Sequence, residues 1–433
     1  MRALLRDRDV RLLMVGQSLS LFGDRAMYLV LGIWVKTLTG SNAQAGAVFF
    51  VLAAPGLIAP LFGLAVDRMR KRPLMIATDV AIGLVLLSLL FVHGRNDVWI
   101  IYAVTALYGA AGYMFTSAQS ALLTVMLPPE RLGEANAALQ SFSEGARLIA
   151  PLIGAGLFAA VGGGAVAALD AATFAASAIC LAALRLREQR PAAPEHHILA
   201  QVAAGVVHIA RSPGLRRIVT VTGVALLVVG FIETAIFAVL QYGIHRPPAF
   251  LGVLSVAQGV GAIAGAVTAP AALRRLGDGR TLGVALLLFA SGDSLFLVPA
   301  LGPVIVGFAI AGAGLSWAVV AFGTAVQLRT PADLQGRVYS AADTLVGTPQ
   351  TLSIALGAVL ITVVDYRLLI GFMGVVTGAC GIFMALAGAE AGPVASDTVA
   401  SHPTEPGSAR GDAAQTRDAP NALVPHGGGQ PPP

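Results

Sequence analysis

The fold of this chain is decided by residues 63–73, which read Gly-Leu-Ala-Val-Asp-Arg-Met-Arg-Lys-Arg-Pro. The segment joins two apolar runs, at about residues 44–66 and 74–93. Each run has roughly the 20 residues with which a helix crosses a hydrocarbon core of ~30 Å. One acid and four bases within seven residues cannot lie in lipid, and such an excess of Arg and Lys is typical of a cytoplasmic loop. The segment therefore predicts two membrane helices joined by a charged cytoplasmic turn.

The composition extends this prediction to the whole chain. Of the 433 residues, 56% are hydrophobic and only 12% are charged, whereas a soluble domain carries about 25% charged residues. So little charge cannot cover a water-facing surface, which indicates a polytopic membrane protein surrounded by a lipid bilayer. The net charge of +5 does not indicate a nucleic-acid partner, because the bases fall in the loops between apolar runs.

Twelve apolar runs of membrane-helix length follow one another along the chain. The loops on one side of the predicted membrane hold twenty Lys and Arg residues, and those on the other side hold four. By the positive-inside rule, the N-terminus, the central loop and the C-terminus are predicted to be cytoplasmic. The runs span residues 12–38, 44–66, 74–93, 98–127, 135–161, 164–186, 216–243, 249–273, 281–300, 303–328, 338–364 and 366–388.

The runs fall into two sets of six that look like repeats. Pro129 and Leu132 before the fifth run match Pro331 and Leu334 before the eleventh. The segment between the two sets has no membrane-length run, and the end of the chain is rich in Pro, Gly and polar residues. The predicted parts are an N-terminal bundle at 1–187, a cytoplasmic linker at 188–215, a C-terminal bundle at 216–388 and a disordered cytoplasmic tail at 389–433.

The sequence contains no motif that is typical of an enzyme active site or of a metal site. The chain has no Gly-x-x-x-x-Gly-Lys-Ser/Thr string for an ATP phosphate. Cys180 and Cys380 lie inside apolar runs and predict neither a disulfide nor a metal site. His196 and His197 fall in the linker and belong to no carboxylate-and-His constellation that would indicate a metal site, so they are predicted to be solvated linker residues. We therefore expect no catalytic residues, no metal and no cofactor.

Ionisable residues inside the apolar runs are costly in lipid, so each is a functional candidate. Asp24 and Arg147 each lie 12 residues past the cytoplasmic start of a run, or ~18 Å deep, and Glu144 shares a helix face with Arg147. These three residues predict a network that lines a cavity in the N-terminal bundle, where a proton or a cationic substrate competes with Arg147 for a carboxylate. A static salt bridge between two helices is the alternative.

Other acids fall elsewhere in the runs. Glu233 lies ~24 Å into the seventh run with aromatic residues nearby, which suits an amphipathic cation, or else it reaches water at the outer interface. Asp343 is shallow in the eleventh run and is predicted to partner a base of the 63–73 loop. Asp170 and Asp293 are predicted to be structural.

The pattern Gly-x-x-x-Asp-Arg-x-x-Lys-Arg at residues 63–72 resembles the signature loop between the second and third helices of the major facilitator superfamily. The resemblance implies an all-α membrane protein with twelve transmembrane helices in two pseudo-symmetric six-helix bundles and a substrate between them. It also implies a conformational latch, in which the acid caps the eleventh helix and the bases hold the closed state. The alternative is that the loop only sets the topology. The latch residues are Gly63, Asp67, Arg68, Lys71, Arg72 and Asp343.

Residues 17–24, Gln-Ser-Leu-Ser-Leu-Phe-Gly-Asp, and 38–41, Leu-Thr-Gly-Ser, look like the macrolide-efflux and siderophore-exporter branch of that superfamily. This implies a proton antiporter that exports a small amphipathic compound from a bacterial cytoplasm, and we expect a monomer in the inner membrane. Two features depart from the antiporter pattern: no Arg lies between residues 99 and 126, and Ala150 and Ala155 replace two glycines of the fifth-helix motif. The alternatives are an uptake or facilitative carrier, a membrane-embedded transferase and a non-transporting sensor.

Overall fold

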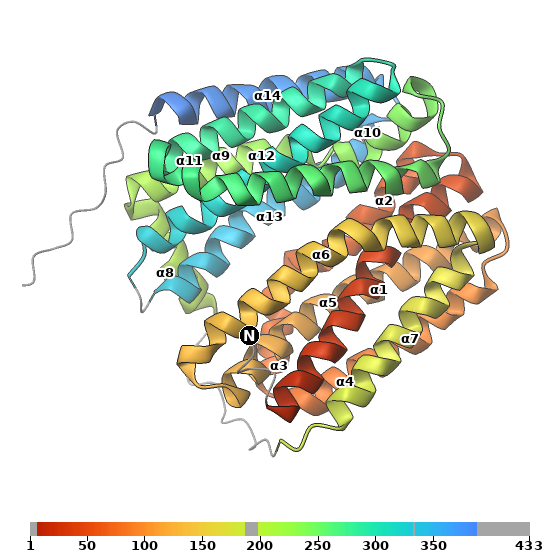
Figure 1. The fold of residues 1–433 in the computed structure, drawn as a ribbon, viewed down its shortest axis with the longest axis vertical. Coiled ribbons are helices and arrows are strands. Elements are labelled where there is room, and N and C mark those ends of the chain that lie inside the picture. The colour runs from red at the N-terminus through yellow and green to blue at the C-terminus, as the bar shows by residue number, and fades with distance from the viewer. Residues whose placement is uncertain (1–6, 187–197, 332–333, 388–433) are drawn as a thin grey trace, which may run out of the picture. The chain divides into compact units, whose positions relative to one another are not determined.

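Figure 1 shows the computed structural model of the chain, in which residues 7–186, 198–331 and 334–387 are described. The described residues are almost entirely helical and contain no strand. This confirms the predicted fold class of an all-α membrane protein. The predicted tail at 389–433 lies outside the described residues, as do residues 188–197 of the predicted linker, so both predictions stay untested.

Helices α1 to α7 form the first helix group, and their ends follow from local chemistry. The Asp7 carboxylate accepts a hydrogen bond of 2.9 Å from the Asp9 N–H at the start of α1, and Gly40 ends that helix with a φ of 71°. The predicted run at 44–66 is not one helix, because Pro55 and Pro60 lack the N–H that a continuous helix needs. The elements are α1 (Arg8–Thr39), α2 (Asn42–Ala53), η2 (Ala54–Ile58), α3 (Ala59–Asp67), α4 (Lys71–Leu87), η3 (Ser88–Phe91), η4 (Arg95–Asp97), α5 (Val98–Met126), α6 (Pro129–Val161) and α7 (Gly163–Ala182).

Helices α8 to α14 form the second helix group. The predicted linker contains the helix α8, which packs against α9 and α13. The predicted runs at 249–273 and 281–300 correspond to two helical parts of α11, which are separated by the non-helical Gly277, where φ is 76°. The second of these runs continues past α11 into η7. The elements are α8 (Ile198–Arg211), α9 (Pro213–Val229), α10 (Ile232–Ala238), η5 (Val239–Gly243), η6 (Pro248–Phe250), α11 (Leu251–Ser294), η7 (Leu295–Leu297), α12 (Leu301–Leu328), α13 (Gln335–Leu360) and α14 (Tyr366–Ala387).

Eight helical stretches of the described residues are long and apolar enough to cross a membrane, and the stretch Pro248–Leu297 holds two of the predicted runs. Two shorter apolar helices, Asn42–Ile58 and Gly145–Val161, correspond to the second and fifth runs. Helix α13 is not among them, although it corresponds to the eleventh run. Its polar residues line the cavity described below, and this accounts for its lower hydropathy.

The hydrophobic core is divided in the same way as the helices. Five of the six clusters of buried apolar side chains lie wholly within one helix group. The remaining cluster joins Leu29, Ile33 and Phe49 of the first group to Phe237 and Leu254 of the second. Helices α2 and α10 meet where the groups join, at the end opposite α8 and the start of α1 (Figure 1). The two groups are therefore packed firmly together at one end.

Candidate functional site

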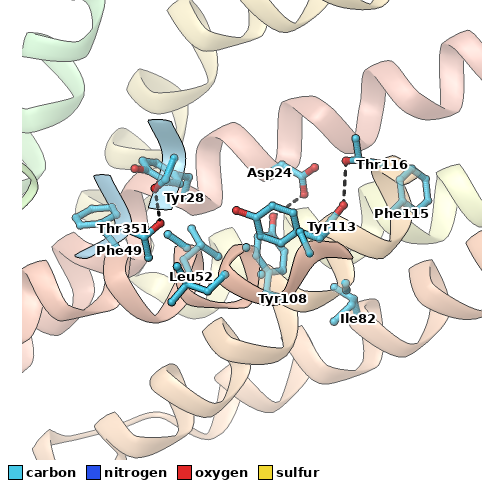
Figure 2. Close-up of a pocket in the computed structure, with 18 of the residues that line it drawn as sticks. Asp24, Tyr28, Phe49, Leu52, Ile82, Tyr108, Tyr113, Phe115, Thr116 and Thr351 are labelled. Carbon is cyan, nitrogen blue, oxygen red and sulfur yellow. Dashed lines mark hydrogen bonds between the residues drawn. The ribbon is translucent and has the colours of Figure 1, made fainter. Parts of the chain in front are cut away.

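A cavity of about 750 Å³ lies between the two helix groups. Helices α1, α2, α4, α5 and α7 line it from the first group, and α10 and α13 line it from the second. Figure 2 shows part of this lining, including Asp24 and Tyr108 from the first group and Thr351 from the second. The volume is within the usual range for a site that encloses a small molecule.

The cavity combines negative charge with aromatic surface. Three of its residues are acids, Asp24, Glu233 and Asp343, and one is a base, Arg25. The Arg25 guanidinium donates a hydrogen bond of 3.1 Å to the Ser143 hydroxyl on α6. Its aromatic residues are Tyr28, Phe49, Tyr108, Tyr113, Phe115 and Phe174.

Asp24 lies on α1 and is bound from α5. The Tyr108 hydroxyl is 2.5 Å from Asp24 Oδ1 and 3.1 Å from Asp170 Oδ2 on α7 (Figure 2 shows the first of these contacts). The Tyr108 ring stands edge-on to Phe174, with centroids 6.0 Å apart. The Glu144 side chain lies outside the described residues, so the predicted network of Asp24, Glu144 and Arg147 stays a prediction.

Glu233 lies in the first turn of α10, where the two helix groups meet. The Tyr28 hydroxyl of α1 donates to Glu233 Oε1 over 3.3 Å. The Tyr28 ring packs against Phe49 at 5.1 Å between centroids. Tyr28, Phe49 and Glu233 all line the cavity, so Glu233 presents a carboxylate beside two aromatic rings where the two helix groups meet.

Beyond Glu233 the two helix groups close against each other. Phe49 and Phe237 stack with centroids 6.3 Å apart and ring planes 18° apart. A Cβ at Gly46 would overlap the Thr234 side chain, so only glycine lets α2 approach α10 this closely. Lys36 is 6% exposed and donates to the Gln241 side chain and, over 2.7 Å, to the Gly40 carbonyl. We call these contacts the closed end.

The opposite end carries the charged 63–73 segment. Lys71 Nζ donates to the Val66 carbonyl over 2.6 Å, and Arg72 donates to the carbonyls of Leu181 and Ala182 over 2.8 and 2.6 Å. Arg68 is exposed, and the Asp67 side chain lies outside the described residues, as does the burial of Gly63. Asp343 is exposed in the cavity wall. The predicted latch therefore stays a prediction.

The second helix group contains an ion pair between α11 and the end of α12. Arg329, at the end of α12, pairs with Asp278 of α11, with Nη2 3.0 Å from Oδ1. The two side chains are only 10% and 9% exposed. The Arg329 carbonyl is 3.0 Å from His208 Nε2, so the same residue also holds α8.

Sequence reasoning missed two residues of this site, Tyr28 and Tyr108, and one buried acid outside its lining, Asp79. Tyr28 and Tyr108 lie in apolar runs, where a tyrosine is indistinguishable from a core aromatic. Asp79 on α4 is 0% exposed and its two carboxyl oxygens have no hydrogen-bond partner among the described residues. An acid inside a predicted membrane run was the signal that could have identified Asp79. Within the same described residues, no three His, Cys, Asp or Glu side chains are placed to hold a metal ion.

A cavity between two groups of membrane helices is the arrangement of a membrane transporter. The family model of the Major Facilitator Superfamily matches residues 13–269, which is more than half of the chain. The chain belongs to the major facilitator superfamily. Its fold is therefore the two-bundle fold that the signature segment predicts.

The relatives and solved structures agree with this assignment. The chain is 24% identical over 362 residues to the uncharacterized MFS-type transporter YfiS of Bacillus subtilis, with 80% of this chain and 85% of that protein covered. It is 27% identical over 362 residues to the uncharacterized MFS-type transporter y4rN of Sinorhizobium fredii, with 81% and 88% covered. A crystal structure of a bacterial homologue of the iron transporter ferroportin, in an inward-facing state, matches with a TM-score of 0.67 and 16% identity, covering 88% of this chain and 98% of that one.

Proposed function

We propose that this protein is a secondary active transporter that exports a small amphipathic compound by alternating access, as a proton antiporter. It would act as a monomer in the cytoplasmic membrane of a bacterium, with both termini inside. The observation that carries the proposal is the cavity between the helix groups, closed at one end and lined by acids and aromatic rings. An enclosed space of this kind can hold a solute while one side is sealed.

The lining favours a cationic substrate with an apolar body. The three acids of the cavity outnumber the single arginine, and that arginine is bound to Ser143. The charge of Arg147 on α6 also acts on Glu233, but Asp24 and Glu233 still place carboxylates on the cavity wall, where they can attract a cation. The rings of Tyr28 and Phe49 beside Glu233 can contact a positive charge or an aromatic group of the substrate.

Alternating access requires the closed end to open while the other end closes. On the predicted topology, the closed end faces the outside and the cavity opens to the cytoplasm, which is the state that loads an exported compound. The latch that we propose would hold the other state, with Asp67 at the N-terminal end of α13 and the bases of the 63–73 segment beside it. The bundles at 1–187 and 216–388 would then move as the two rigid bodies.

An accumulation assay tests the proposal. Antibiotics, siderophores and fluorescent cationic dyes are given to a pump-deleted host that expresses the chain, with and without an uncoupler. We expect lower accumulation of at least one cationic compound, and loss of that difference with the uncoupler. Equal accumulation of every compound in cells with and without the chain would contradict the proposal.

A substitution in the cavity wall tests whether the cavity binds the transported compound. Glu233→Gln removes one carboxylate charge but keeps the hydrogen bond from Tyr28. We expect it to weaken transport of cationic compounds at least about tenfold, the effect of losing one charge-assisted interaction. Asp365→Asn is the matched control, because that exposed acid lies outside the cavity. Equal transport by the two variants would contradict the role of Glu233.

The direction of transport separates export from the second candidate, an uptake or facilitative carrier of the same fold. Inverted membrane vesicles with an imposed pH gradient distinguish the two. An exporter would concentrate the compound inside inverted vesicles when the interior is acidic. A facilitative carrier would only equalise the concentrations.

A further inference from the structure

The Tyr108 hydroxyl contacts two carboxylate oxygens, and these two contacts need one more hydrogen than the hydroxyl carries. A tyrosine hydroxyl carries one hydrogen and can donate it to one acceptor at a time. Yet the Tyr108 oxygen is 2.5 Å from Asp24 Oδ1 and 3.1 Å from Asp170 Oδ2. If both acids were ionised, one of the two contacts would place oxygen against oxygen with no hydrogen between them.

Thr173 does not supply the missing hydrogen. Its hydroxyl is 2.8 Å from the Asp170 main-chain carbonyl and 3.2 Å from Asp170 Oδ1, so its hydrogen goes to the nearer carbonyl. Asp170 is 0% exposed, and burying an ionised carboxylate away from a counter-charge is strongly unfavourable. The missing hydrogen therefore belongs on a carboxyl group of Asp24 or Asp170.

The surroundings of these groups contain a further acid and few bases. The charge of Arg25 acts on Asp24 from the same helix, and Asp79 faces Asp24 from α4. On α6, Arg147 acts on Tyr28 and Glu233. Asp79 is fully buried, and neither of its oxygens has a partner among the described residues.

The close approach of α1 and α7 is built into the sequence. A Cβ at Gly23 would overlap the Asp170 carboxylate and the Thr173 hydroxyl. Glycine at this position thus lets Asp170 reach the hydroxyl that also binds Asp24. Asp24 and Tyr108 line the cavity and Asp170 lies behind them, so the hydroxyl connects a cavity-facing acid to a buried one.

We propose that Asp24, Tyr108 and Asp170 form a binding site for one shared proton, the acid–tyrosine cluster, which exchanges with the transport cavity through Asp24. When the proton moves outward, the O–H bond of Asp170 breaks and its hydrogen joins Tyr108. The former Tyr108 hydrogen forms a new O–H bond with Asp24. Tyr108 is neutral before and after, and the negative charge passes from Asp24 to Asp170.

A substrate cation and the shared proton would compete for the Asp24 carboxylate, which lines the cavity. The cluster would release its proton to the cavity through Asp24 before the cation binds there, and it would take up a proton again after the cation leaves. The cluster thus gives the proposed antiport a physical basis, and this inference rests on the proposed function only for that coupling. The shared proton itself can be tested without any substrate.

The test is infrared spectroscopy of the purified full-length chain in lipid nanodiscs at neutral pH. A protonated carboxyl group absorbs in a carbonyl-stretch region separate from that of a carboxylate. We expect Asp170→Asn to remove one such band and Tyr108→Phe, which keeps the ring packed on Phe174, to shift it. Tyr102→Phe on the same helix is the matched control, because its hydroxyl binds only the Gln44 carbonyl among the described residues, and it should leave the band unchanged.

The outcomes separate the cluster from the function. If neither Asp170→Asn nor Tyr108→Phe changes the carboxyl band, the shared proton does not exist and the inference is wrong. Ethidium export from reconstituted vesicles then tests the coupling. We expect export driven by a pH gradient to fall at least about tenfold in Asp170→Asn, while downhill ethidium exchange remains. If the carboxyl band behaves as expected but ethidium export does not depend on the pH gradient, the shared proton is supported and proton antiport is refuted.

Discussion

Replacing Gly46 with alanine should move the protein out of the observed conformation. The new methyl group would overlap the Thr234 side chain where α2 meets α10. This contact joins the two helix groups, so the clash arises only while the closed end is closed. The substitution therefore acts on a conformational equilibrium rather than on the folding of either helix group.

The size of the effect follows from packing. Inserting an extra methyl group into a well-packed contact costs about 1–3 kcal/mol. If that cost falls on one conformation alone, the ratio of closed to open molecules changes by about 5- to 150-fold. An alanine in place of glycine also favours the helix itself by up to ~1 kcal/mol in both conformations, which leaves the ratio unchanged.

Spin labels across the closed end measure this ratio. Gln44 on α2 and Tyr242 on η5 are both exposed and flank the contact, so each can be replaced with cysteine and labelled after Cys180 and Cys380 are changed to alanine. We expect Gly46→Ala to shift the distance distribution toward longer separations.

The control is Gly156→Ala on α6, where a Cβ would meet no atom within 4 Å. It should leave the distance distribution as in the parent protein. If Gly46→Ala gave the same distribution as this control, the closed end would not depend on the approach of α2 to α10, and the argument would be refuted.

Two further substitutions test contacts within and between the helix groups. Asp278→Asn should lower the free energy of unfolding by about 3–5 kcal/mol, because it leaves the buried Arg329 without its counter-charge, whereas the exposed Arg275→Gln should change it little. Denaturation of the purified proteins compares them, and equal stability would show that the ion pair is dispensable. Lys36→Met removes the hydrogen bond to Gln241 and should lengthen the spin-label distance across the closed end. An unchanged distance would mean that this bond does not hold the helix groups together.

Much of the fold could be predicted because hydropathy is a local property. The bilayer requires about 20 apolar residues per crossing and excludes charge, so the alternation of apolar runs and basic loops is readable from the sequence. The structure confirms the all-helical fold. It differs where backbone geometry decides: Pro55 interrupts the second run.

The candidate site could be predicted only in part. Asp24 and Glu233 were recognisable because an acid inside an apolar run is costly wherever it points. Their partners were not, since Tyr108 is 84 residues from Asp24 and Tyr28 is 205 residues from Glu233. Nothing in the local pattern distinguishes these two tyrosines from other aromatic residues of the runs.

The sequence by itself determined which segments are helical, which of them suit lipid, and the superfamily to which they belong. Only the tertiary structure decided which helix faces meet. Close approach depends on a glycine of one helix lying opposite a side chain of another, as Gly23 lies opposite Asp170 and Gly46 opposite Thr234. These pairings bring a hydroxyl between two acids and close one end of the cavity. They depend on the packing of segments that are distant in the sequence. The bilayer requires only that each helix be hydrophobic, so the fit between helix surfaces decides which helices pack together.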